Sequence, residues 1–181
     1  MGRMWVAALA LLAAGCGAGG GDEKKADAPP ALLPAGTWTV TSEVTGFRSL
    51  DKNPPALKAK VGDKETATIC APKAAPEPPA ALFAGTGYQC AYKSAFIKDG
   101  LLNATLDCRR AGIEGSILMT VQGSYTAKGF DGTADTTAYL PGPGDFGMNR
   151  KISGTVKPGA CTPSPAGGGG GNAAGGAEDT D

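Results

Sequence analysis

Tyr-Gln-Cys-Ala-Tyr-Lys-Ser-Ala-Phe-Ile-Lys-Asp-Gly-Leu-Leu-Asn-Ala-Thr-Leu-Asp-Cys-Arg, residues 88–109, is the stretch that decides the fold class. Apolar and polar residues alternate on both sides of Lys98-Asp99-Gly100, and a period of two is typical of a half-buried β-hairpin. A three-residue loop with glycine in the left-handed conformation fits residues 98–100. With that loop the facing pairs are Phe96–Leu102, Ser94–Ala104, Tyr92–Leu106 and Cys90–Cys108.

The register of this hairpin has one alternative. A two-residue Asp-Gly loop would shift the pairing by one residue and place Cys90 opposite Arg109. A non-hydrogen-bonded antiparallel pair brings Cα atoms to about 4.5 Å, which is close enough for a disulfide. The match of Cys90 with Cys108 therefore favours the three-residue loop.

Outside the hairpin the same alternation continues, and it predicts an all-β domain. Strands are predicted at Thr37–Thr45, Leu57–Val61, Thr66–Cys70, Gly115–Thr126, Thr133–Leu140 and Met148–Val156, with turns at Gly129–Gly132 and Pro141–Asp145. Ala80–Phe83 is predicted to form one helical turn that plugs the core. We expect a small antiparallel β meander that forms a barrel or a sandwich, stapled by disulfides and flanked by flexible tails.

The N-terminus has the pattern of a bacterial lipoprotein leader. A short basic segment ending at Arg3 precedes the apolar run Met4–Ala14, which is too short to span a bilayer and fits a secretory signal. Leu12-Ala13-Ala14-Gly15-Cys16 resembles a lipobox. That resemblance implies a signal peptide at residues 1–15 and a membrane anchor of lipids on Cys16. An ordinary cleaved signal peptide is the alternative. By analogy with enteric bacteria, Gly17 in place of aspartate after the cysteine favours the periplasmic side of the outer membrane over the inner membrane.

The predicted organisation of the exported chain is a tether, one domain and a tail. Residues 16–35 form the flexible tether, residues 36–161 the β domain, and residues 162–181 a disordered, glycine-rich acidic tail. The envelope is oxidising, so the four remaining cysteines are expected to pair. Cys90–Cys108 leaves Cys70–Cys161. A metal site is the alternative use of these cysteines, but the chain has no CxxC motif and no histidine.

The order of these features resembles a family of bacterial envelope proteins, the domain of unknown function 3617 family (DUF3617). The matching elements are Gly36-Thr37-Trp38, Thr68-Ile69-Cys70-Ala71-Pro72, Leu82-Phe83, Cys90 with Cys108, Gly123-Ser124-Tyr125-Thr126, Lys151-Ile152-Ser153-Gly154 and Gly159-Ala160-Cys161. The chain departs from the family pattern in its long C-terminal tail and in Lys157-Pro158. The resemblance implies no activity, cofactor or catalytic residue.

Composition argues against several kinds of chemistry. Histidine is absent, which removes the usual proton shuttle near neutral pH. Basic and acidic residues balance at 17 each, so bulk charge indicates no nucleic-acid partner. The carboxylates are spread over turns and outward strand faces, and no serine-nucleophile motif is present. We expect no catalytic residue, cofactor or metal.

Two classes of function remain. The first is a non-catalytic module at the membrane that binds an apolar ligand, a glycan or an envelope protein. The second is an unfamiliar enzyme that uses carboxylates, and a structural assembly factor is a further alternative. The candidate surfaces are Pro72–Pro79, Pro141–Asp145 and Arg109–Glu114.

Overall fold

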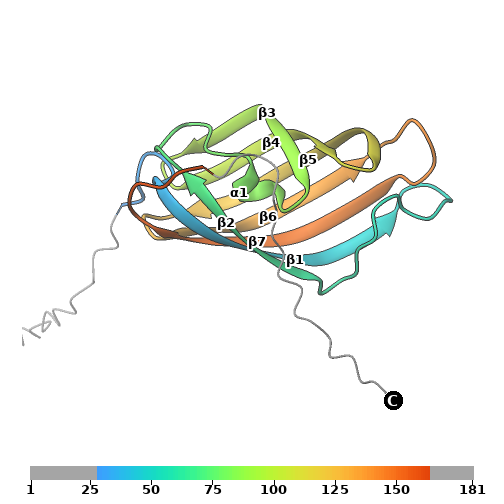
Figure 1. Cartoon of the computed structure of the whole chain (residues 1–181), viewed down its shortest axis with the longest axis horizontal. Helices are drawn as coiled ribbons and strands as arrows, with labels where there is room; N and C mark the ends of the chain where they lie inside the picture. Colours follow the sequence, from blue (N-terminus) through green and yellow to red (C-terminus); the bar gives the residue numbers. More distant parts are fainter. Residues whose placement is uncertain (1–27, 164–181) are drawn as a thin grey trace, which may run out of the picture.

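In a computed structural model of the chain, the described residues are 28–163, and they form one antiparallel sheet that curls into a half-barrel (Figure 1). The strands are β1 (Gly36–Ser49), β2 (Lys64–Ala71), β3 (Tyr88–Lys98), β4 (Leu101–Arg110), β5 (Ile113–Tyr125), β6 (Gly129–Ala138) and β7 (Phe146–Lys157). Their order in the sheet is β2-β1-β7-β6-β5-β4-β3. The all-β fold is confirmed, and of the two expected forms a curled single sheet is observed instead of a sandwich.

The half-barrel is filled by a short helix. The helix α1 (Ala81–Ala84) lies between β2 and β3, which are the two edge strands (Figure 1). Leu82 and Phe83 are both fully buried. The ring of Phe83 meets that of Phe130 edge-on at 5.4 Å, and Phe130 lies 5.5 Å from Trp38. The helical turn that was predicted to plug the core is therefore confirmed, and we call α1 the plug.

The register prediction for the β3–β4 hairpin is wrong next to the loop and correct at the cysteines. Its loop has two residues, Asp99 and Gly100, and both have positive φ, at 52° and 83°. Such a loop suits Asp-Gly because its twist matches that of the flanking strands. Ile97 therefore pairs with Leu102. The predicted pairs Phe96–Leu102 and Ser94–Ala104 do not form, and Phe96 points outward.

A β-bulge restores the predicted register farther along the hairpin. The pairing shifts between Tyr92 and Ser94, where β3 contains one extra residue. Beyond the bulge Tyr92 faces Leu106 and Cys90 faces Cys108. The cysteine match is thus compatible with the two-residue loop that it was used to reject.

Two further segment predictions are wrong. Leu57–Val61 is not a strand but part of the connection between β1 and β2, where Leu57 and Ala59 pack against the core. Gly129–Gly132 is not a turn but the start of β6. A Cβ atom at Gly129 would collide with the carbonyl oxygen of Gly154 on β7. These glycines allow neighbouring strands to approach closely. The sequence alone does not distinguish a glycine with this role from a glycine in a turn.

The two disulfides have the pairing expected from the hairpin. Cys90 and Cys108 face each other across β3 and β4 with a Cα–Cα distance of 4.0 Å. Cys70, near the end of β2, is joined to Cys161 after β7. The second bridge fastens an edge strand to the end of the domain.

The segment before β1 packs on one end of the half-barrel. The carbonyl oxygen of Ala31 accepts hydrogen bonds from the Asp99 amide and the Tyr125 hydroxyl, and Leu33 is buried. We call this end the tether pole. The predicted signal peptide, Cys16, the predicted tether up to residue 27 and the predicted tail from residue 164 lie outside the described residues. Between residues 28 and 163, no helix is long and apolar enough to cross a membrane.

Candidate functional site

Arg150 is a charged residue on the inward face of β7. In this strand the inward positions include Met148, Arg150 and Ile152, and Arg150 is only 3% exposed. Removing a guanidinium from water costs several kcal/mol unless hydrogen bonds and opposite charge compensate. The partners of Arg150 therefore show why a charge is tolerated there.

The plug supplies the main acceptors for Arg150. Its Nη2 donates to the carbonyl oxygens of Ala84 at 2.8 Å and Phe83 at 3.3 Å. Its Nη1 donates to Ser42 Oγ at 3.3 Å, while its Nε is buried and has no partner among the described residues. Arg150 thus ties the end of the plug to the sheet and retains one unused donor.

The charge of Arg150 is only partly compensated. Its Nη1 lies 3.7 Å from Oε1 of Glu65, a carboxylate on β2 whose side chain is 36% exposed. The two oxygens of Glu65 instead accept hydrogen bonds from the Thr86 amide at 3.1 Å and the Thr86 hydroxyl at 2.5 Å. Burial lowers the pKa of Arg150, but an arginine remains protonated. The pair is formally neutral, but its two charges are 3.7 Å apart and share no hydrogen bond.

Tyr88 and a second arginine extend the cluster. The guanidinium carbon of Arg110 lies 4.6 Å from the centroid of the Tyr88 ring, and that of Arg150 lies 5.9 Å from it. Arg110 Nη1 also donates to the Thr86 carbonyl at 2.8 Å. The Tyr88 hydroxyl is buried without a hydrogen-bond partner in the described part of the chain, and burial raises its pKa. It therefore stays protonated and can donate.

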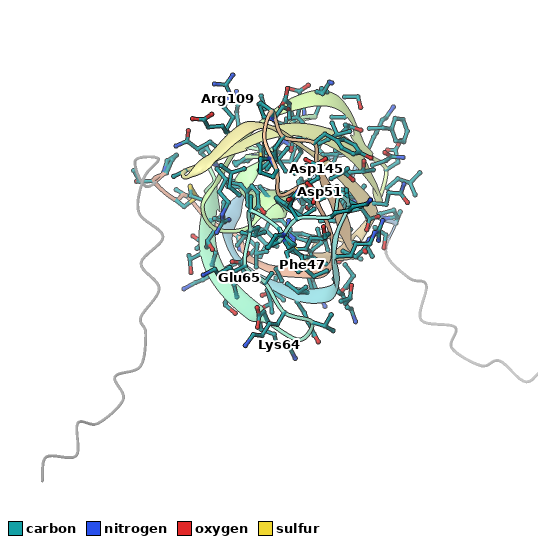
Figure 2. All side chains as sticks on the ribbon, turned by 90° about the vertical axis from the view of Figure 1, so that its right-hand side faces the viewer. Phe47, Asp51, Lys64, Glu65, Arg109 and Asp145 are labelled. Carbon is teal, nitrogen blue, oxygen red and sulfur yellow. A yellow bond between two sulfur atoms is a disulfide. The ribbon has the colours of Figure 1, made fainter. Side chains whose placement is uncertain are left out.

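These residues line a cleft of about 160 Å³, which we call the Arg150 cleft. Its lining consists of Ser42, Val44, Leu57, Lys58, Ala59, Asp63, Lys64, Glu65, Thr86, Tyr88, Arg110, Met148 and Arg150. Four of these are basic and two are acidic, and the others include an apolar wall formed by Val44, Leu57 and Met148. In Figure 2, which looks onto the end of the half-barrel away from the tether pole, Glu65 and Lys64 lie on one side and Arg109 on the far rim.

Gly85 allows the chain to pass close to this cluster. Its φ is +81°, and a Cβ atom there would collide with Glu65 Oε1 and Arg150 Nη1. Any larger residue would therefore separate the plug from the ion pair, in addition to straining the backbone.

The candidate surfaces named from sequence lie elsewhere. Arg109 and Glu114 line an open hollow of about 610 Å³ at the β4–β5 turn, the outer hollow, whose walls are mostly exposed residues. The Pro72–Pro79 segment is held to β3 by a 2.8 Å hydrogen bond from Tyr92 to Pro78. In the Pro141–Asp145 loop, Gly144 and Asp145 donate backbone hydrogen bonds to Asp51.

The carboxylates of the Arg150 cleft are used locally. Asp63 is exposed and accepts a hydrogen bond from the Lys60 amide at 2.8 Å, and Glu65 is held by Thr86. Within residues 28–163, no group of three or more histidine, cysteine, aspartate or glutamate side chains is placed to hold a metal ion. The chemistry of the cleft is that of fixed donors beside an apolar wall.

Sequence reasoning missed Arg150, Tyr88, Glu65 and Gly85 as a cluster. One signal could have found its centre, because Arg150 interrupts the apolar face that Met148 and Ile152 define at a period of two. The other members come from β2, β3 and the segment after the plug, and only the curl of the sheet brings them to Arg150.

The fold and the site define a class: a disulfide-stapled, antiparallel half-barrel with a helical plug and one cationic cleft. A family model described as a protein of unknown function (DUF3617) matches residues 33–161. The chain belongs to this family, as the order of its motifs suggested. No curated protein matches the chain, and no solved structure does.

Proposed function

We propose that this protein is an envelope lipoprotein that binds a small ligand in the Arg150 cleft without catalysis. The anchor is the lipidated Cys16, and the periplasmic side of the outer membrane is the favoured location. The observation that carries the proposal is that two residues lining the cleft, Arg150 and Tyr88, each have a buried donor, Nε and the hydroxyl, without an acceptor in the described chain. A ligand that supplies acceptors would satisfy both.

The position of the cleft supports this role. The tether reaches the domain at the pole formed by the β3–β4 turn, where Ala31 contacts Asp99. The cleft includes Tyr88 at the start of β3 and Arg110 at the end of β4, and therefore lies toward the opposite pole (Figures 1 and 2). A chain anchored at Cys16 would be attached to the membrane through the tether pole, at the end of the domain away from the cleft.

The hydrogen bonds of the two carboxylates in the cleft favour binding over catalysis. Asp63 and Glu65 line the cleft, but general acid–base catalysis would require a carboxylate oxygen free to exchange a proton with a substrate. Both already accept hydrogen bonds from neighbouring backbone amides.

The anchor is tested by replacing Cys16 with Ala and fractionating cells. We expect an acyl mass on the N-terminus of the mature wild-type chain and release of the variant from the membrane after leader cleavage. A wild-type N-terminus without acyl groups would refute the anchor.

The ligand is tested by purifying the protein from membranes and analysing denatured extracts by mass spectrometry. Ala59→Trp would fill the Arg150 cleft, and Ala111→Trp places the same bulk in the exposed outer hollow. We expect a stoichiometric small molecule with wild type and Ala111→Trp that is lost with Ala59→Trp. Equal recovery from both variants, or no recovery from any, would refute ligand binding in the cleft.

A further inference from the structure

We infer that the ligand of the Arg150 cleft is an anionic amphiphile, whose carboxylate or phosphate group binds between Arg110 and Arg150 while its apolar part lies on Val44, Leu57 and Met148. This inference rests on the proposed ligand-binding function and specifies its ligand class.

The first argument is the kind of group that is missing. Arg150 Nε and the Tyr88 hydroxyl are donors, and both are buried without an acceptor among residues 28–163. Arginine offers no acceptor at all. A cation or a donor-rich ligand would leave Arg150 Nε unsatisfied. An anionic oxygen satisfies it and forms the stronger, charge-assisted type of hydrogen bond.

The second argument is charge. Lys58, Lys64, Arg110 and Arg150 line the cleft against Asp63 and Glu65. Lys64 is also paired with Glu43 at 3.2 Å, so one basic charge remains in excess although the whole chain is neutral by formal charge. Clefts lined by an excess of one sign concentrate ligands of the opposite sign. The basic excess is therefore a local property of this cleft and not of the protein.

The third argument is the weak link between Glu65 and Arg150. Glu65 Oε1 is 3.7 Å from Arg150 Nη1, beyond hydrogen-bond distance, and its side chain is partly exposed. An entering anion can take a place beside Arg150 while Glu65 keeps its hydrogen bonds to Thr86, because no hydrogen bond joins Glu65 to Arg150. Glu65 then repels the bound anion, and neutralising it should strengthen binding.

The apolar wall indicates an amphiphile and not a bare ion. Val44 and Met148 are buried core residues of β1 and β7, and Leu57 packs against the core from the β1–β2 connection. All three line the cleft beside the arginines. Each methylene group buried against such a wall strengthens binding by about fourfold, from roughly 0.8 kcal/mol.

The inference is tested with four probes of known structure: hexanoate, acetate, inorganic phosphate and hexan-1-ol. Residues 17–181 with oxidised cysteines contain every residue that the structure describes, so this chain is titrated by ¹H–¹⁵N NMR. The Arg150 Nε–H signal, assigned by its loss in Arg150→Lys, reports on the buried donor. We expect hexanoate to shift this signal and to bind at least tenfold more tightly than acetate or phosphate, and hexan-1-ol not to shift it.

Two variants and a matched control locate the anion. Arg110→Gln should weaken hexanoate binding at least fivefold, and Glu65→Gln should strengthen it by about the same factor. Arg109→Gln removes the same charge one residue away, outside the cleft, and should change the affinity less than twofold. Equal effects of Arg109→Gln and Arg110→Gln would overturn the inference.

The probes also separate this inference from the proposed function. Binding of hexan-1-ol as tight as that of hexanoate would overturn the anionic class and leave ligand binding intact. Equal affinity for acetate and hexanoate would overturn the amphiphile. A neutral molecule recovered from membranes with wild type but not with Ala59→Trp would likewise overturn the anionic class and leave ligand binding intact. Recovery of no molecule would refute the proposed function itself.

Discussion

Replacing Phe83 with Ala tests whether the plug holds the half-barrel together. Phe83 is fully buried and packs on Phe130, which in turn contacts Trp38. A buried Phe→Ala change costs about 3–5 kcal/mol, because apolar contacts are lost and a cavity remains. The matched control is Phe96→Ala, since Phe96 is 56% exposed on β3. Surface changes of this kind cost less than about 0.5 kcal/mol.

Urea unfolding, monitored by tryptophan fluorescence with both disulfides oxidised, measures the difference between these variants. For an m value of about 2 kcal/mol per molar urea, Phe83→Ala should lower the midpoint by about 2 M. Phe96→Ala should lower it by less than about 0.3 M. Far-UV circular dichroism should show that both variants retain the sheet before urea is added. Equal midpoints for the two variants would refute the role of the plug.

Two further predictions concern the cysteines and Asp51. Removing the Cys70–Cys161 bridge should cost more stability than removing the Cys90–Cys108 bridge, because it closes the longer loop, with a sequence separation of 91 residues against 18. The chain-entropy model gives about 4.5 kcal/mol for the long loop and about 3 kcal/mol for the short one. A larger loss for the hairpin bridge in urea unfolding would contradict this order. Backbone amides hold the pKa of Asp51 well below its usual range. Its contribution to stability is therefore present above the unfolded pKa of about 4 and is lost as the pH falls through the lower folded pKa. Asp51→Asn should reduce stability at pH 7 and make the acid-induced loss smaller, and unchanged pH profiles of the urea midpoint would count against it.

The sequence predicted the strands well where one face is buried. Ile117, Met119, Val121 and Tyr125 were expected on one face of their strand, and all four are buried in β5. A period of two records which side of a strand faces the core, so it survives uncertainty about the partners. The same logic failed at Leu57–Val61, where half-buried side chains belong to a connection without a β-ladder.

The β3–β4 register shows why pairing is harder to predict than strand position. The two-residue loop and the bulge after Tyr92 are two local departures that offset each other in the pairing of Cys90 with Cys108. The pairing of two cysteines determines only the total register shift between the cysteine pair and the hairpin loop, and not where each shift occurs. It therefore predicted the disulfide and misplaced Phe96, which lies between the two departures.

The Arg150 cleft is a consequence of how the concave face of the half-barrel is covered. A curled sheet with two free edges exposes its concave face unless another element covers it, and here the plug does so. A buried helix end brings carbonyl groups that need donors, and Arg150 supplies them at Phe83 and Ala84. A lysine at that position would offer one ammonium instead of a fork of donors. The guanidinium satisfies the plug with Nη2, keeps Nε as a buried donor without a partner among residues 28–163, and adds its charge to the lining of the cleft. Arg150 thus both supports the plug and adds a positive charge to the cleft. Replacing Arg150 by Met should therefore lower the urea midpoint and abolish anion binding together. Arg110→Gln removes only the partly buried contacts with Thr86 and Tyr88, so it should weaken anion binding with a smaller loss in the urea midpoint.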